Sequence, residues 1–190
     1  MIAPPPKSLQ TLLWHICPAH HRDEALYFGR RNKNRFDDPR GKYGTLYVSP
    51  DLTTAFLESV FHNRRLKTPA DHVVTQQFLS KWVVKPILLP HVLNLADLSA
   101  PYALANMGYD NSVLTVRGSY SKSKTLSCKL HEATPEWDGL IWDSRQGGST
   151  DCVVLFDRCA ARLVHAPPDI DLLRHFDFPR VVSDLHLIVC

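Results

Sequence analysis

The sequence lacks the motifs that would place it in several large enzyme classes. Its 190 residues contain no GxGxxG, no P-loop lysine motif, no GxSxG and no HExxH segment. A glycine-rich phosphate cradle, a serine-hydrolase elbow and a zinc-protease helix are therefore not indicated. The longest apolar stretches have the length of a β-strand, so no segment is expected to cross a membrane.

The sequence also lacks a cysteine pairing pattern and a signal peptide. Cysteine occurs five times, an odd number, and no two cysteines form a CxxC pair. This usage favours a reducing compartment, with most thiols acting as small core residues. Residues 1–7 are rich in proline and contain no apolar run, so no signal peptide is expected. We therefore predict a cytoplasmic protein.

Metal-binding and nucleophile patterns are missing as well. None of the ten histidines stands at a spacing typical of zinc ligands, and the adjacent His20 and His21 would not converge on one ion. No local sequence marks one of the cysteines as the nucleophile of a protease. We predict no metal site and no resident cofactor.

The composition is that of an ordinary globular domain. Apolar residues make up 44% and charged residues 22%, which is enough for a core and argues against disorder. The net charge of +3 is too small and too evenly spread for a nucleic-acid surface, and no helix-turn-helix pattern occurs. We expect an irregular arm over residues 1–8 and a single domain over residues 9–190.

Turn residues and helix signals divide the chain into elements. Residues 17–43 are predicted to form a long polar loop, and such loops are often functional. A helix is expected over residues 50–64, with Ser49 as its N-cap and Pro50 at its first position. A second helix is expected over residues 120–131, and Asp97 is expected to cap a short one.

Hydrophobic alternation predicts more strands than helices. Residues 139–144 and 152–156 should pair as a hairpin across a glycine turn. The other predicted strands are residues 44–48, 82–89, 92–95, 162–165 and 181–189, with a helical turn and a strand within residues 9–16. No βαβ alternation occurs, so the fold class is α+β, a mixed and mostly antiparallel sheet flanked by helices.

One series of residues carries a recognisable pattern. Arg35 is followed by Phe36 and Asp37, Tyr47 ends a predicted strand, and Glu58 lies eleven residues further on in the predicted helix. Ser144 comes late, at the end of another predicted strand. In order and spacing over residues 12–157, the chain resembles the RES-domain toxins, a family named for an arginine, a glutamate and a serine.

The sequence departs from the family pattern at one place. The interval between Arg35 and Tyr47 is a residue or two longer than is common in the family. This leaves Tyr43 as a rival for the tyrosine position.

The resemblance implies an ADP-ribosyltransferase-like fold and an enzyme that consumes NAD⁺ as its substrate. It also implies a partner, an Xre-type helix-turn-helix antitoxin. The residue types suit this chemistry. Glu58 would stabilise the ribosyl cation that forms as nicotinamide leaves, and Arg35 would bind the pyrophosphate. Tyr47 or Tyr43 would stack on the pyridinium, and Ser144 would orient the carboxamide or the ribose.

Each of these residues also has a purely structural interpretation. Glu58 lies on the polar stripe of its helix and could simply be solvated. Arg35 could pair with a neighbouring aspartate, Tyr47 could pack across strands, and Ser144 could start the hairpin turn. Arg145 could be a second phosphate contact or plain surface charge.

The acceptor of the ADP-ribosyl group stays open at this point. Water would give a glycohydrolase, phosphate a phosphorylase, and a protein side chain an ADP-ribosyltransferase. We favour degradation of free NAD⁺, because no exposed acceptor-recognition loop stands out. A non-catalytic binding module is the alternative from another class. The sequence leaves the oligomeric state and the surface for an antitoxin undetermined.

Overall fold

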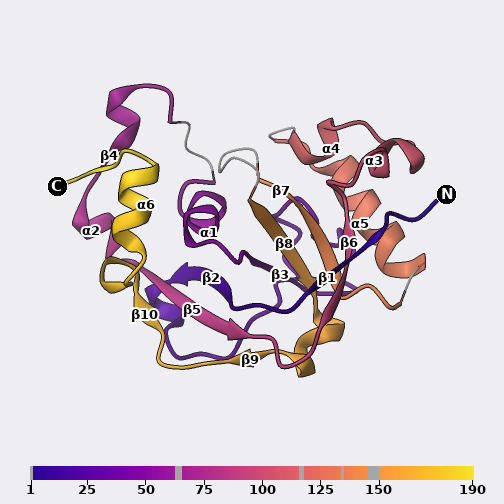
Figure 1. The fold of residues 1–190 in the computed structure, drawn as a ribbon, viewed down its shortest axis with the longest axis horizontal. Coiled ribbons are helices and arrows are strands. Elements are labelled where there is room, and N and C mark those ends of the chain that lie inside the picture. Colours follow the sequence, from indigo (N-terminus) through magenta and orange to yellow (C-terminus); the bar gives the residue numbers. More distant parts are fainter. Residues whose placement is uncertain (1, 63–65, 116–117, 134, 145–149) are drawn as a thin grey trace.

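A five-stranded sheet, the main sheet, lies at the centre of the molecule (Figure 1). The structure, a computed structural model, describes residues 2–62, 66–115, 118–133, 135–144 and 150–190. Five strands form the main sheet in the order β1-β6-β7-β8-β3, with β6 and β7 parallel and the other pairs antiparallel (Figure 1). They are β1 (Pro6–Leu9), β6 (Leu93–Asp97), β7 (Gly139–Asp143), β8 (Asp151–Phe156) and β3 (Thr45–Val48).

A second sheet continues from the edge of the first. Its order is β10-β5-β2, with β9 also paired to β5. An isolated antiparallel bridge between Trp14 and Ser49 links it to the end of β3. A separate parallel pair joins β11 to β4. The strands are β2 (Leu13–Pro18), β4 (Val73–Val74), β5 (Trp82–Leu88), β9 (Val164–His165), β10 (Ile170–Asp171) and β11 (Ile188–Val189).

Helices cover the sheets on two sides. In Figure 1, α1 and α6 lie together on one side of the main sheet, and α3, α4 and α5 lie on the other. The α-helices are α1 (Leu52–Ser59), α2 (Gln76–Leu79), α3 (Ala103–Asn106), α4 (Ser112–Thr115), α5 (Ser121–Ala133) and α6 (Phe178–Asp184). The 3₁₀ turns are η1 (Ala19–His21), η2 (Pro69–His72), η3 (Asp157–Arg162) and η4 (Leu172–Arg174).

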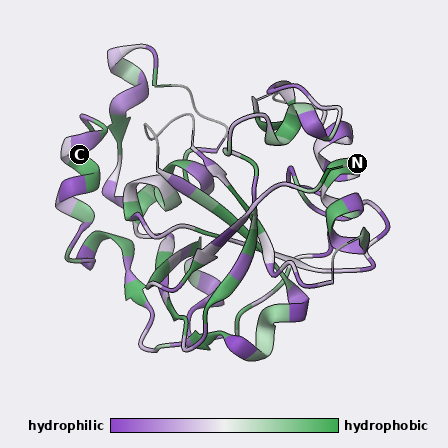
Figure 2. Ribbon diagram, turned by 45° about the vertical axis from the view of Figure 1, so that its right-hand side comes forward, coloured by the Kyte–Doolittle hydropathy of each residue, from purple (hydrophilic) through white to green (hydrophobic). Residues whose placement is uncertain are grey.

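The core follows from this layering. One apolar cluster joins α1 and α6 to β2, a second lies between α5 and the main sheet, and a third fills the space between the sheets. Figure 2 shows hydrophobic residues on the central strands and hydrophilic ones on many outer helical turns. The prediction of an α+β domain with a mixed, mostly antiparallel sheet is confirmed. Within the described ranges, no helix is long and apolar enough to span a bilayer.

The prediction of an irregular arm over residues 1–8 is wrong from Pro6 onward. Pro6–Leu9 form β1, because their backbone pairs antiparallel with β6 and Leu9 stands opposite the buried Leu93. Even Pro5 is engaged, since its carbonyl accepts from the Asp97 amide at 3.0 Å. Proline occurs at the edge of a sheet, where a missing N–H costs no ladder bond.

The first helix begins later than predicted. Its N-cap is Asp51, whose side chain accepts from the Thr54 amide, and the helix starts at Leu52. Ser49, the predicted cap, instead donates to the carbonyl of Asp151 at 2.8 Å. The helix ends at Ser59 with Val60 as its C-cap, and residues 63 and 64, the end of the predicted range, lie outside the described residues.

Two further element predictions are wrong. Asp97 ends β6 and accepts from the Ser99 amide at 2.9 Å, so it caps a turn and not a helix. Residues 181–189 were expected as a strand, but α6 runs to Asp184 and only β11 is extended. Val181 and Leu185, four residues apart, are both buried against α1, which is helical spacing.

Candidate active site

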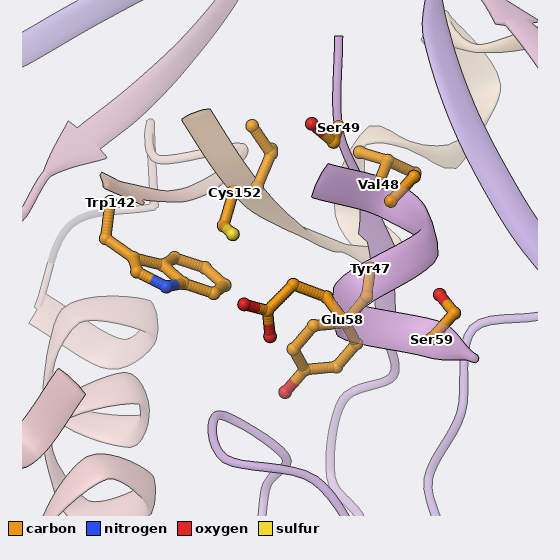
Figure 3. A pocket seen from close by; sticks show the side chains of 9 residues that line it. Tyr47, Val48, Ser49, Glu58, Ser59, Trp142 and Cys152 are labelled. Carbon is orange, nitrogen blue, oxygen red and sulfur yellow. The ribbon is translucent and has the colours of Figure 1, made fainter. Parts of the chain in front are cut away.

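A cleft lies between α1 and the ends of β3, β7 and β8. Its empty volume, including the part open to solvent, is about 270 Å³. Figure 3 shows the carboxylate of Glu58 pointing toward the indole of Trp142, with the ring of Tyr47 below it. The lining residues are Tyr47, Val48, Ser49, Ala55, Glu58, Ser59, Trp142, Cys152 and Val153.

The structure brings Glu58 and Ser144 into direct contact. Glu58 lies in the last turn of α1, and Ser144 follows β7, 86 residues later, where its hydroxyl donates to Glu58 Oε1 at 3.2 Å. The backbone fixes Ser144, because its amide donates to the carbonyl of Thr150 at 2.8 Å and so extends the β7–β8 ladder. Ser144 is buried. A hydroxyl held in this way restricts the orientation of the carboxylate beside it.

Tyr47 enters the cleft from β3 and is held at its hydroxyl. The oxygen accepts from the Phe36 amide at 2.8 Å, and the hydroxyl donates to Asp37 Oδ1 at 3.3 Å. Burial, with the Asp37 charge in second place, raises the pKa of Tyr47 well above its ordinary value. The phenol is therefore neutral at any physiological pH.

Tyr43, the rival tyrosine, lies in the core. It is 2% exposed, and its ring stacks on His131 with centroids 3.9 Å apart. Its hydroxyl lies 2.7 Å from the hydroxyl of Ser127 on α5. Of the two candidates, the structure therefore places Tyr47 in the cleft and Tyr43 against α5.

Arg35 stands close to Tyr47 but is not among the described residues that line the cleft. Its Nη1 donates to the carbonyl of Val113 at 3.0 Å, and its guanidinium lies over the ring of Tyr120, 4.9 Å from the centroid. The positive charge of Arg35 acts to lower the pKa of the Tyr47 phenol, against the larger effect of burial. Arg145, the remaining candidate residue, lies outside the described residues.

Sequence reasoning missed Trp142 and Cys152 as lining residues. They are opposite each other in the β7–β8 register, and Tyr47 pairs with Val154, two residues along from Cys152. Residues two apart on a strand share a face, so Trp142, Cys152 and Tyr47 point to the same side of the sheet. The predicted hairpin contained this signal, because its register sets which residues oppose each other.

Cys152 adds no reactive group to the cleft. Its side chain is buried, and burial, followed by the charge of Glu58, raises the pKa of the thiol far above its usual range. A protonated thiol is a poor nucleophile. Among the described residues, no group of three or more His, Cys, Asp or Glu side chains could hold a metal ion.

Comparison with known proteins identifies the family. The family model of the RES domain matches residues 12–179. The chain therefore belongs to the RES domain family.

A solved structure shares the fold. A chain of the crystal structure of the M. tuberculosis MbcT–MbcA toxin–antitoxin complex superimposes with a TM-score of 0.61 at 14% sequence identity. The match covers 85% of this chain and 86% of that one. At this identity the likeness shows a common fold. A search of curated protein sequences gives no significant match.

Proposed function

We propose that the protein cleaves the nicotinamide–ribose bond of NAD⁺ in the cytoplasm, as a glycohydrolase or phosphorylase and as the toxin of a toxin–antitoxin pair. The RES domain family is known for NAD⁺ consumption. The observation that carries the proposal is the contact of the Ser144 hydroxyl with Glu58, whose side chain lines the cleft together with Tyr47 and Trp142.

Glu58 supplies the electrostatic part of the reaction. As the bond to nicotinamide breaks, positive charge develops on the ribose, as in the oxocarbenium transition state of glycosidases. A carboxylate beside the ribose stabilises that charge more strongly in the transition state than in the bound substrate. Ser144 keeps the carboxylate in one orientation. Nicotinamide leaves as a neutral molecule, so no general acid is required.

Tyr47 and Arg35 supply binding. The nicotinamide ring of NAD⁺ is a cation, and the face of a neutral phenol attracts cations. Arg35 is the candidate for the pyrophosphate, since a guanidinium binds phosphate oxygens in a bidentate way. Its present contacts with the Val113 carbonyl and the Tyr120 ring hold it beside the cleft.

An antitoxin partner is part of the proposal. The fold is shared with a chain from a structure described as a toxin–antitoxin complex. An enzyme that drains NAD⁺ requires such a restraint. We propose an Xre-type helix-turn-helix protein as the partner, in line with the sequence resemblance.

The test follows free nicotinamide after the purified protein is mixed with NAD⁺. We expect release by the wild type and a loss of about 10²–10³-fold in kcat for Glu58→Gln, the range seen when an electrostatic stabiliser is removed. Arg35→Ala should mainly raise KM. Glu132→Gln is the matched control, because Glu132 pairs with Arg40 on an exposed surface.

The outcomes separate the alternatives. A wild type that releases no nicotinamide would leave a binding module as the function. Equal rates for wild type and Glu58→Gln would move the active site elsewhere. Dependence on added phosphate would indicate a phosphorylase, and transfer of label from NAD⁺ to protein would indicate an ADP-ribosyltransferase.

A further inference from the structure

Asp37 is a buried carboxylate that joins two parts of the proposed active site. It is 1% exposed, and buried carboxylates require partners. Its Oδ2 accepts from the backbone amides of Lys33 at 2.9 Å and Asn34 at 2.8 Å. Its Oδ1 accepts from the hydroxyls of Thr45 at 2.7 Å and Tyr47 at 3.3 Å. Oδ2 therefore holds the loop at Lys33 and Asn34, and Oδ1 holds two side chains of β3.

These contacts decide which part of Tyr47 faces a ligand. The Tyr47 oxygen accepts from the Phe36 amide and its proton is directed at Asp37. A phenol carries one proton, so in this arrangement none is directed into the cleft. Tyr47 offers the cleft its ring, which lies beside Glu58 (Figure 3).

We propose that Asp37 is a positioning residue for NAD⁺ binding, which fixes the ring of Tyr47 and the loop carrying Arg35 in one arrangement. The inference rests on the function proposed above. Asp37 acts through these two residues and does not touch the substrate. The pyridinium is cationic only until its bond to ribose breaks, so a stacked ring stabilises the bound substrate at least as strongly as the transition state. Loss of Asp37 should therefore raise KM more than it lowers kcat.

A double-mutant cycle tests this coupling. Asp37→Asn keeps the size of the side chain but replaces one acceptor oxygen by a donor. We expect Asp37→Asn to raise KM roughly tenfold in the wild-type background, the loss of a hydrogen bond to a charged group, and clearly less in a Tyr47→Phe background. An equal rise in both backgrounds, or a loss confined to kcat, would overturn the proposal.

Asp38 provides a matched control. It is the next residue, equally buried at 1% exposure, but it accepts from the backbone amides of Arg40 and Lys42. Asp38→Asn should leave the KM for NAD⁺ unchanged. If it raises KM as much as Asp37→Asn does, the effect is a general loosening of the loop and Asp37 has no special role.

A spectroscopic measurement tests the contact without activity. In protein labelled with ¹³Cζ-tyrosine, the Tyr47 signal is assigned by its loss in Tyr47→Phe. Burial and the charge of Asp37 raise the pKa of Tyr47, so Asp37→Asn should let Tyr47 ionise at lower pH. Asp38→Asn should not. An unchanged Tyr47 titration in Asp37→Asn would overturn the inference, even in an active enzyme.

The wild type alone provides a safeguard if Asp37→Asn does not fold. Its Tyr47 signal should remain unchanged at an alkaline pH at which free tyrosine, with an ordinary pKa of about 10, ionises. Ionisation of Tyr47 at the pH of free tyrosine would overturn the inference. A wild type that releases no nicotinamide would overturn the proposed function, and the difference in Tyr47 titration between wild type and Asp37→Asn would still decide whether Asp37 holds Tyr47.

Discussion

The proposed chemistry depends on one carboxylate in a restricted orientation. Glycosidases use two carboxyl groups because their leaving group must be protonated. Nicotinamide departs without a proton, so a single carboxylate is sufficient. Here that carboxylate is Glu58, and the Ser144 hydroxyl donates to its Oε1 at 3.2 Å. In the proposed reaction, Ser144 would position the carboxylate and Glu58 would face the developing charge.

The state of Cys152 gives a prediction at the level of a single side chain. Although Cys152 lines the cleft, the residue is only 2% exposed and the pKa of its thiol is raised by burial. We expect iodoacetamide at neutral pH to leave Cys152 unmodified in the folded protein, because only an accessible thiolate reacts quickly. Peptide mapping by mass spectrometry measures the modification.

Cys190 is the internal control for this experiment, since it is exposed. It should be labelled under the same conditions, and nicotinamide release should survive the treatment. Rapid labelling of Cys152 accompanied by loss of activity would show that the cleft opens to a reactive thiol.

The position of Glu58 is set by the helix that carries it. α1 spans only Leu52–Ser59, and helices of this length depend on caps and packing. Asp51 caps it through the Thr54 amide at 2.7 Å and also accepts from Arg180 on α6 at 2.7 Å. The N-cap therefore fixes the helix both to its own first turn and to its neighbour.

We predict that Asp51→Ala lowers the free energy of unfolding by about 1–2 kcal/mol, the upper part of the range for loss of an N-cap. Arg180→Gln should cost less, roughly 0.5 kcal/mol, because the guanidinium is 45% exposed and its ion pairs are screened by solvent. Urea denaturation of the two variants measures both values. A larger loss for Arg180→Gln would mean that the link to α6, and not the cap, holds α1.

A buried ion pair ties distant segments together. Lys85 on β5 and Asp169 form a salt bridge in which both side chains are almost fully buried. Asp169 also accepts from the Asp23 amide at 2.8 Å, and Lys85 donates to the carbonyl of Glu24 at 3.0 Å. This ion pair therefore connects the second sheet with the loop that contains Asp23 and Glu24 and with the C-terminal segment that contains Asp169.

We predict that Asp169→Asn lowers the free energy of unfolding by about 3–5 kcal/mol, because it leaves the Lys85 charge buried without its partner. Urea denaturation at neutral pH provides the value. Asp171→Asn is the control, since Asp171 pairs with Arg22 at a site where both side chains are 36% exposed. A similar loss in that variant would show that burial of the pair is not the cause.

Because of the Lys85–Asp169 ion pair, the free energy of unfolding should decrease as the pH falls. Burial alone would raise the pKa of Asp169, but hydrogen bonds from Lys85, the Asp23 amide and His165 outweigh it, so the pKa is lowered. A lowered folded pKa contributes stability above the unfolded value, about 3.9, and the contribution is lost as pH falls through the folded pKa. The difference between wild type and Asp169→Asn should therefore shrink in acid.

The local sequence determined many of the elements correctly. The hairpin of β7 and β8, the strands β3 and β5 and the helix α5 follow from hydrophobic alternation and helical spacing, which depend on neighbouring residues. The order Arg35, Tyr47, Glu58 and Ser144 likewise indicated the RES domain family that the family model shows. The signal for α6 is also local, with Pro179 in its first turn, but the β-branched residues Val181 and Val182 that follow favour a strand.

The tertiary structure alone decided which residues meet. Residues 6–9 form a strand in place of the expected arm because β6 lies alongside them, with Leu9 opposite Leu93. An edge strand forms only where such a partner strand is present. Tyr47 lies in the cleft because β3 pairs with β8 in a register that turns its side chain to that face. Tyr43 lies in the core because α5 covers it. The contact of Glu58 with Ser144 spans 86 residues of sequence. Sequence patterns report the local environment of a residue, whereas such contacts depend on how whole elements pack.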